Sequence, residues 1–238
     1  MTTIERVRIM VLGDSGVGKT SFVHLAAHNE PVKSPSWTIG CSVEVKLHEY
    51  KEGTRDQKTF FIEFWDVGGS KIHSNARKVF YHPCHGAILV HDLSNRKSEE
   101  NLQGWLQELL LHDHLNGSHL NYREHTEDVT DAENLLGMTN FMPILEVGTK
   151  LDQADEKRSN LSNNNSFRCK YNAEEILLDC RQARYLAAGT SNAVKLSRFY
   201  DKVIENKLQD RQKSFSERFK SNAISPIYSS KYYLSHHD

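Results

Sequence analysis

The chain has few cysteines, no long apolar run and no excess charge of either sign. Its four cysteines form no C-x-x-C pair, which indicates a reducing compartment and argues against a disulfide scaffold or a cysteine zinc site. No stretch has the length and apolarity of a membrane-spanning helix, and no signal peptide is present, so we expect a cytoplasmic protein. With 30 basic and 31 acidic residues, the net charge of −1 predicts no nucleic-acid partner.

Histidine is the residue whose number invites a metal hypothesis, because the chain has 13 of them. The closest groupings in the sequence are His82/His85, His112/His114 and His236/His237. None of them has a third ligand at a spacing typical of zinc sites. We therefore interpret these histidines as surface or loop residues.

The strongest motif is the P-loop pattern G-x-x-x-x-G-K-T at residues 13–20. A strand-like run, 7–12, precedes it, and a helix-compatible run, 21–27, follows it, which is the context that the motif requires. Its glycines allow successive backbone N–H groups to point inward and bind an anion. Lys19 is then expected to reach the β- and γ-phosphates, and the Thr20 hydroxyl to hold Mg²⁺. The alternative is a glycine turn that holds no ligand.

A second motif, D-x-x-G at residues 66–69, follows an apolar strand at 59–65. The Asp66 carboxylate can hold a metal-bound water, and Gly69 allows the backbone to approach a γ-phosphate. Alternation of apolar and polar residues over 43–47 predicts a half-buried strand that pairs with 59–65 as an antiparallel hairpin.

Further strands are predicted at 86–92, 143–148 and 176–179, and the chain alternates between strands and helices. Ser98 is the expected cap of a helix that places Leu102, Trp105 and their apolar neighbours on one face. This alternation predicts an α/β domain with a mostly parallel sheet and one antiparallel edge strand. Ligands bind such sheets at the carboxyl ends of the strands, where both motifs lie.

The predicted domain spans residues 1–213 and contains two polar insertions, at about 112–142 and 153–172. A final amphipathic helix begins near Asn192. Residues 214–238 are predicted to be a flexible polar tail.

The segment Thr149-Lys150-Leu151-Asp152 indicates which base is bound. The Asp152 carboxylate can accept two hydrogen bonds from N1 and N2 of guanine, whereas adenine offers no such pair of donors. The stem of Lys150 can lie along the purine ring. The segment resembles the N/T-K-x-D motif of Ras-type GTPases, and the resemblance covers most of residues 5–207. Within that superfamily the chain resembles the Rab branch most. Segments such as WDVGGS and GTKLDQ resemble the Rab-like protein three subfamily.

This resemblance implies a six-stranded P-loop NTPase small G domain with helices on both faces, which binds GTP or GDP with Mg²⁺. The implied metal residues are Thr20, Thr38 and Asp66, and Thr38, nineteen residues after Lys19, senses the γ-phosphate. The implied catalytic group is Lys19, Thr38, Gly69 and Ser70. The implied nucleotide contacts are Gly13, Ser15, Gly16, Val17, Gly18, Lys19, Thr20, Ser21, Thr38, Gly69, Thr149, Lys150, Asp152, Cys180 and Arg181.

Four departures from the family pattern bear on mechanism. Ser70 stands where Ras-type proteins usually have a glutamine, so hydrolysis is expected below the roughly 10⁻⁴ s⁻¹ of unassisted Ras. Pro31 replaces a frequent aromatic residue over the guanine, which favours faster nucleotide release. The loop that contacts the edge of the base, the base-edge loop, lacks the usual S-A-K sequence and is either 179–182 or 187–190. The last cysteine is Cys180, so no lipid anchor is expected.

The sequence leaves two functions open. One is a GTP-dependent switch that signals through effector and regulatory proteins of the small-GTPase system. The other is a poorly cycling scaffold in which the nucleotide is structural. The resemblance also implies self-association as a homodimer, a role in the handling of other small GTPases and the regulation of their prenylation, and a link to cell proliferation. Recruitment to membranes is then expected only through partners. An adenine-nucleotide enzyme is disfavoured by Asp152.

Overall fold

The computed structural model describes residues 4–116, 142–154 and 166–222. The strands are β1 Glu5–Leu12, β2 Cys41–Tyr50, β3 Lys58–Val67, β4 Gly86–Asp92, β5 Ile144–Thr149 and β6 Glu174–Leu177. The α-helices are α1 Lys19–His28, α2 Ser74–Arg77, α3 Arg96–Glu100, α4 Leu102–Asn116, α7 Ser166–Tyr171 and α8 Ser191–Asn222. Short 3₁₀ turns are η1 Lys71–His73, η2 Lys78–Phe80, η4 Leu151–Gln153 and η6 Ala183–Leu186.

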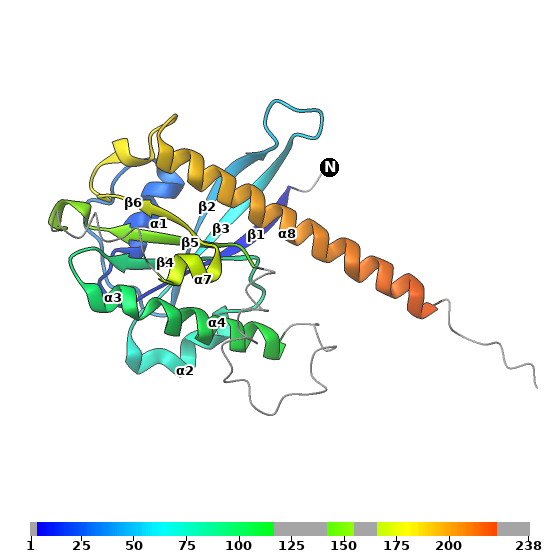
Figure 1. Cartoon of the computed structure of the whole chain (residues 1–238), viewed down its shortest axis with the longest axis horizontal. Coiled ribbons are helices and arrows are strands. Elements are labelled where there is room, and N and C mark those ends of the chain that lie inside the picture. The colour runs from blue at the N-terminus through cyan, green and yellow to red at the C-terminus, as the bar shows by residue number, and fades with distance from the viewer. Residues whose placement is uncertain (1–3, 117–141, 155–165, 223–238) are drawn as a thin grey trace, which may run out of the picture.

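The strands form one six-stranded sheet in the order β2-β3-β1-β4-β5-β6 (Figure 1). Only the edge pair β2–β3 is antiparallel, and all other neighbours are parallel. The predicted fold class and the opening hairpin are therefore confirmed. Because the P-loop follows β1 at the centre of the sheet, its neighbours β3 and β4 both end beside it.

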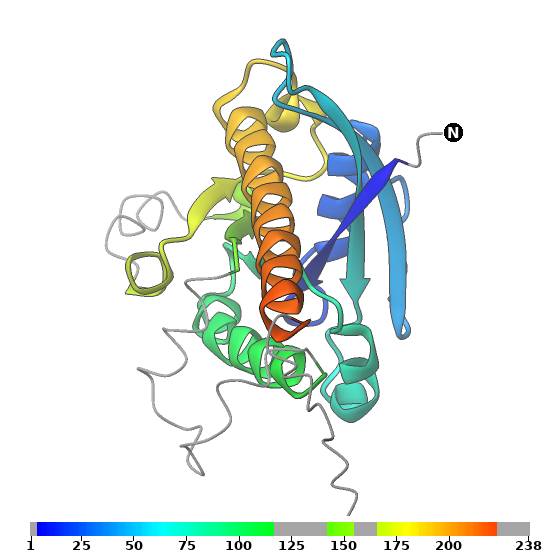
Figure 2. The ribbon, with the colours of Figure 1, turned by 90° about the vertical axis from the view of Figure 1, so that its right-hand side faces the viewer.

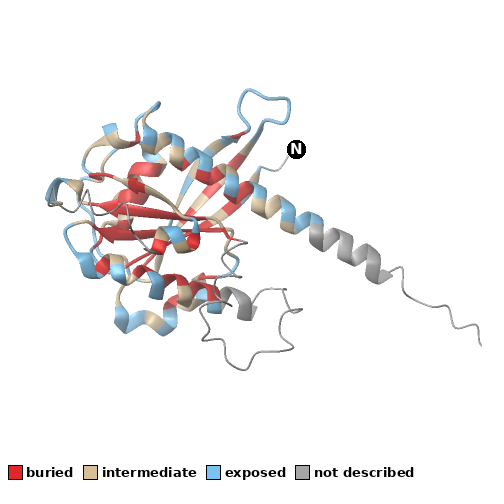
Figure 3. Ribbon diagram, viewed as in Figure 1, coloured by how far each residue is buried: buried red, intermediate tan, exposed pale blue. Residues whose placement is uncertain are grey.

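Two apolar layers enclose the sheet. On one face, α1 and α8 pack against the strands through residues such as Phe22, Leu25, Phe199 and Val203. On the other face, five buried side chains of α4 and two of α7 pack against the strands. Burial is concentrated in the central strands (Figure 3), and α8 runs beside the hairpin of β2 and β3 (Figure 2).

The local patterns explain this arrangement. Every residue of β4 and of β5 is buried, as expected for parallel strands that are covered on both faces. Edge strand β2 instead alternates between partly and largely exposed residues over 43–49, and ends at the buried Tyr50. Helix α3 is capped by Asn95, whose side chain accepts from the backbone N–H of Lys97. Ser98 was predicted to cap the helix that carries Leu102 and Trp105. It instead lies inside α3, where its buried hydroxyl donates to the carbonyl of Asn95.

Three predicted boundaries shift. Strand β6 begins at Glu174, two residues before the predicted strand at 176–179. Helix α4 continues to Asn116, so the start of the 112–142 insertion is helical, and Met142 at its end is buried. The rest of that insertion, and most of the one at 153–172, lie outside the described residues.

Helix α8 is longer than predicted, since it continues to Asn222. The tail boundary placed at 213/214 therefore falls inside a helix, and residues 214–222 are not an irregular tail. Extension of an existing helix is favourable, and 212–222 contains no proline or glycine to stop it. Residues 223–238 lie outside the described residues. Within the described ranges, no helix is long and apolar enough to cross a membrane.

His85 provides a test of the packing before β4. Its Nδ1 accepts from the backbone N–H of Arg8 (2.9 Å), and its own backbone N–H donates to the Arg8 carbonyl (3.0 Å). Burial, and then the nearby Lys207 ammonium, lower the pKa of His85 to about 4. His85 is therefore protonated below about pH 6.5 in the unfolded state, but only below about pH 4 in the folded state.

We predict that His85 lowers the free energy of unfolding as the pH falls from about 6.5 to about 4. In His85→Asn, the amide oxygen can still accept from Arg8 but does not titrate. The variant should therefore lose less stability over this window than the wild type, measured by urea unfolding at several pH values. Parallel losses in both proteins would contradict the assignment.

Candidate nucleotide site

The P-loop joins the end of β1 to the start of α1. Gly13, Gly16 and Gly18 have positive φ angles of 148°, 78° and 96°. At Gly13 a Cβ atom would lie 2.1 Å from the Val90 carbonyl oxygen, so only glycine fits between the loop and β4. Ser15 and Gly16 are exposed at the crest of the loop, where an anion would meet the backbone N–H groups. Ser21 is partly exposed in the first turn of α1.

Lys19 folds back along the loop. Its Nζ donates to the carbonyl oxygens of Gly13 and Asp14, each at 2.9 Å. Burial lowers the pKa of Lys19 to about 8, although Asp66 and Asp14 oppose the shift. A bound phosphate would stabilise the charged ammonium, so the side chain is placed to gain from an anion in the loop.

Three oxygen-bearing side chains converge beside Lys19. The Thr20 hydroxyl lies 2.5 Å from Asp66 Oδ2 and 3.0 Å from the Thr38 hydroxyl, which is itself 3.2 Å from Asp66 Oδ2. Asp66 is fully buried, and its Oδ1 has no hydrogen-bond partner among the described residues. Carboxylate and hydroxyl oxygens are the ligands that Mg²⁺ prefers, so this donor set fits the cation predicted from the sequence.

The D-x-x-G segment lies directly on the P-loop. The Gly68 N–H donates to the Gly40 carbonyl at 2.9 Å. A Cβ atom on Gly69 would lie 2.5 Å from the Gly13 oxygen and 2.6 Å from the Ser15 nitrogen. Ser70 follows with its carbonyl accepting from Arg77 Nη1 (3.0 Å), and its side chain makes no capping bond to η1.

The T-K-L-D segment begins at the end of β5. Thr149 is fully buried, and its hydroxyl lies 2.5 Å from the Val17 carbonyl and 3.0 Å from the His91 carbonyl. Thr149 therefore positions the P-loop rather than facing a base. Lys150 has a left-handed φ of 55°, and its Nζ lies 2.6 Å from Asp92 Oδ2.

Asp152 faces the loop that follows β6. Its Oδ2 lies 2.7 Å from Arg181 Nη2, and Arg181 Nε also contacts Asp179 Oδ1 at 3.2 Å. Cys180 is buried, and burial, with Asp179 beside it, raises the pKa of its thiol to about 12. Of the two candidates for the base-edge loop, 179–182 is therefore the one in contact with Asp152.

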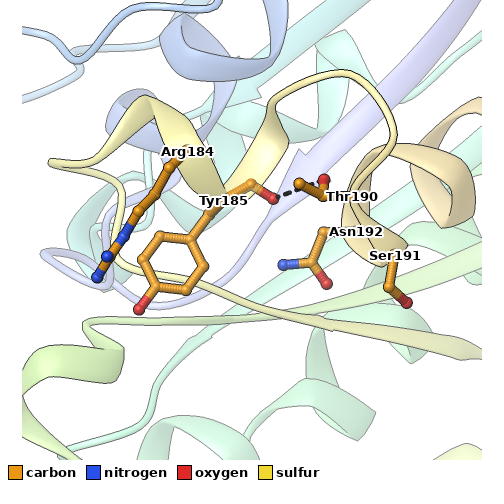
Figure 4. A pocket seen from close by; sticks show the side chains of 5 residues that line it. All are labelled: Arg184, Tyr185, Thr190, Ser191 and Asn192. Carbon is orange, nitrogen blue, oxygen red and sulfur yellow. Dashed lines mark hydrogen bonds between the residues drawn. The ribbon is translucent and has the colours of Figure 1, made fainter.

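The other candidate, 187–190, borders a shallow pocket between η6 and α8 (Figure 4). Arg184, Tyr185, Thr190, Ser191 and Asn192 line it, and the Thr190 hydroxyl donates to the Tyr185 carbonyl at 3.3 Å. None of these residues is acidic, so the pocket offers no carboxylate to the N1–N2 edge of guanine.

Asn101 and Trp105, which the sequence analysis did not assign to the site, hold the P-loop in place through Asp14. Asp14 accepts from Trp105 Nε1 at 2.8 Å and from Asn101 Nδ2 at 2.7 Å. Trp105 was predicted to be a core residue, and it is buried in the core, but its indole N–H also fixes the loop. Helical periodicity identifies its buried face and carries no signal for the hydrogen bond.

The geometry defines a P-loop domain, and comparison with known proteins gives its class. Residues 8–118 match the family model described as Roc, the Ras of Complex domain of DAPkinase. The chain is 41% identical over 112 residues to the small GTPase-like protein LIP2 of Arabidopsis thaliana, covering 44% of this chain and 34% of that protein. The chain is a small GTPase of the Ras superfamily.

More extensive similarity defines the branch. Identity is 50% over 213 residues with Rab-like protein 3 of Bos taurus, covering 87% of this chain and 88% of that protein. It is 48% over the same length with Rab-like protein 3 of Homo sapiens. The chain therefore belongs to the Rab-like protein 3 family.

We predict that Asp152→Asn lowers the affinity for GTP roughly 100-fold or more, because an amide cannot accept both guanine donors. Arg181→Gln is the matched control, since it removes the partner of Asp152 but keeps the carboxylate. Competition of GTP and ATP against a fluorescent GDP analogue measures both variants. Equal losses in the two would show that the Arg181–Asp152 pair, and not base recognition, is what matters.

Proposed function

We propose that this protein is a GTP-dependent switch in which Mg²⁺ and the γ-phosphate order the segments that carry Thr38 and Gly69. The observation that carries the proposal is the convergence of Thr20, Thr38 and Asp66 within 2.5–3.2 Å of one another. Thr20, Thr38 and Asp66 would hold the Mg²⁺ ion, which when bound supplies positive charge for phosphoryl transfer. Its loss would release the Thr38 segment, which is the two-state element of such a switch.

Slow hydrolysis is the second part of the proposal. Lys19 would hold the β- and γ-phosphates, and the Gly69 N–H would contact the γ-phosphate. Ser70 has no side-chain amide to orient an attacking water, and its backbone carbonyl accepts a hydrogen bond from Arg77. The protein alone would then remain in the GTP state unless a partner supplies the missing group. Nucleotide release would be fast, because Pro31 lacks the aromatic ring that would cover the base.

Base selection rests on the loops after β5 and β6. Lys150 would lie along the purine. Asp152 would accept hydrogen bonds from guanine after the Arg181 side chain moves away from its carboxylate. Cys180 and Arg181 would border the base from the 179–182 loop. We extend the proposal to effectors and regulators of the small-GTPase system, to self-association and to cytoplasmic action, because the Rab-like resemblance implies them.

The first test is the nucleotide content of the purified full chain, followed by a timed GTP chase with Mg²⁺. We predict bound guanine nucleotide and conversion below roughly 10⁻⁴ s⁻¹. Ser70→Gln should raise the rate, and Ser70→Ala, the matched control, should leave it unchanged. Bound ATP, or faster hydrolysis by the wild type than by Ser70→Gln, would contradict the proposal.

One observation favours the second function, a scaffold that cycles poorly. Arg77, from the segment after Gly69, donates to both oxygens of Glu108 on α4 at 2.7 Å and 2.6 Å. The Tyr81 hydroxyl donates to Glu108 at 2.8 Å. Arg77 also stacks on Trp105, 4.1 Å from the ring centroid. This network, in which Arg77 and Tyr81 are buried, holds residues 71–81 against α4 and would restrict their movement between nucleotide states.

We predict that Glu108→Ala destabilises the fold by about 3 kcal/mol, because it leaves the Arg77 guanidinium buried without its carboxylate. Glu108→Gln keeps one acceptor and should cost less. If the network limits switching, Glu108→Gln should also widen the difference in protease susceptibility of residues 71–81 between the GTP-analogue and GDP states. An unchanged difference in a stably folded variant would remove the support for a rigid scaffold.

A further inference from the structure

The outer surface between α1 and β2 carries two histidines and a glutamate that no step of nucleotide binding uses. His24 and His28 lie one helical turn apart on α1, and Glu44 lies opposite them on β2. One ligand atom from each residue lies within 4.8 Å of the other two. Glu44 follows the segment that contains Thr38, and His28 precedes it.

The side chains already point toward one another. His28 Nε2 lies 2.5 Å from Glu44 Oε2, and His24 Nδ1 lies 3.8 Å from Glu44 Oε1. The two imidazole rings are tilted by 47°, with centroids 4.7 Å apart. Two ligands at about 2.1 Å from a tetrahedral ion are roughly 3.4 Å apart, so small side-chain rotations would complete the geometry. All three side chains are partly exposed, which leaves them free to rotate and an ion free to enter.

A fourth residue supports the arrangement. The second ring nitrogen of His24, Nε2, lies 3.9 Å from Glu30 Oε1. Metal-bound histidines commonly present their other nitrogen to a carboxylate, which fixes the ring orientation and raises its basicity. Glu30 can therefore orient His24 while Nδ1 faces the shared position.

We propose that His24, His28 and Glu44 bind a zinc-class divalent metal ion at the surface between α1 and β2. Two imidazole ligands favour zinc over magnesium, and none of the three residues belongs to the cation site at Asp66. The helical segment His24-Leu25-Ala26-Ala27-His28 has no glutamate beside its first histidine, and therefore lacks the general base of an H-E-x-x-H peptidase. Three protein ligands leave a position for water, so the ion binds reversibly and bridges the two elements.

The test is zinc titration of the untagged, chelator-treated full chain against a chromophoric chelator, in the presence of Mg²⁺ and GDP. The wild type should bind one Zn²⁺ with micromolar or better affinity. His24→Gln/His28→Gln and Glu44→Gln should each weaken that binding at least tenfold. His73→Gln is the matched control, because this exposed histidine of η1 lies outside the cluster, and it should leave binding unchanged.

Two further readouts separate a built site from general surface binding. Cobalt(II) should give the visible spectrum of a four-coordinate ion in the wild type and not in the double histidine variant. Zinc should raise the Tm of the wild type by several degrees and not that of the variant. Absence of stoichiometric zinc, or equal binding by the wild type and the folded double variant, would overturn the proposal.

Discussion

The structure depends most on one buried carboxylate, that of Asp66 at the end of β3. Removing a carboxylate from water is costly unless donors or cations compensate it, and here the hydroxyls of Thr20 and Thr38 approach one oxygen only. The strand register fixes this meeting point. Asp66 pairs with Val11 of β1, just before the P-loop, and with Ser42 of β2, just after the Thr38 segment. A slip of either pairing would move the carboxylate away from both partners.

A second set of contacts joins the P-loop to the segment after D-x-x-G through α4. Asp14 accepts a hydrogen bond from the Trp105 indole, and Arg77 stacks over the same ring. Glu108, one turn further along α4, accepts from Arg77. Opposite charges alternate with one aromatic ring along this path, and its two central members, Trp105 and Arg77, are buried. Displacement of the P-loop would therefore disturb Trp105, which is buried and donates to Asp14.

Much of the fold was predictable because its signals are local. The P-loop glycines, the buried run of β4 and the alternation of β2 each depend on neighbouring residues, and each was found. The contacts that were missed join distant segments. Glu146 breaks the apolar pattern of β5, and predicting that its Oε1 lies 3.2 Å from His91 Nε2 on β4 requires knowing which strands are neighbours. The length of α8 was missed because polarity was interpreted as an irregular tail, although the same residues favour a helix that projects from the body.

The histidine cluster shows the same limit more sharply. Sequence spacing drew attention to pairs such as His82/His85, whereas His24 and His28 gain a third ligand only because the Thr38 segment returns the chain to β2. Thr20 and His24 are four residues apart on α1, about 6 Å along its axis. Ser42 and Glu44 are two residues apart on β2, and Ser42 lies beside Asp66. Both donor clusters therefore include residues of α1, which one cluster joins to Asp66 on β3 and the other to Glu44 on β2. The Thr38 segment runs from α1 to β2 between them.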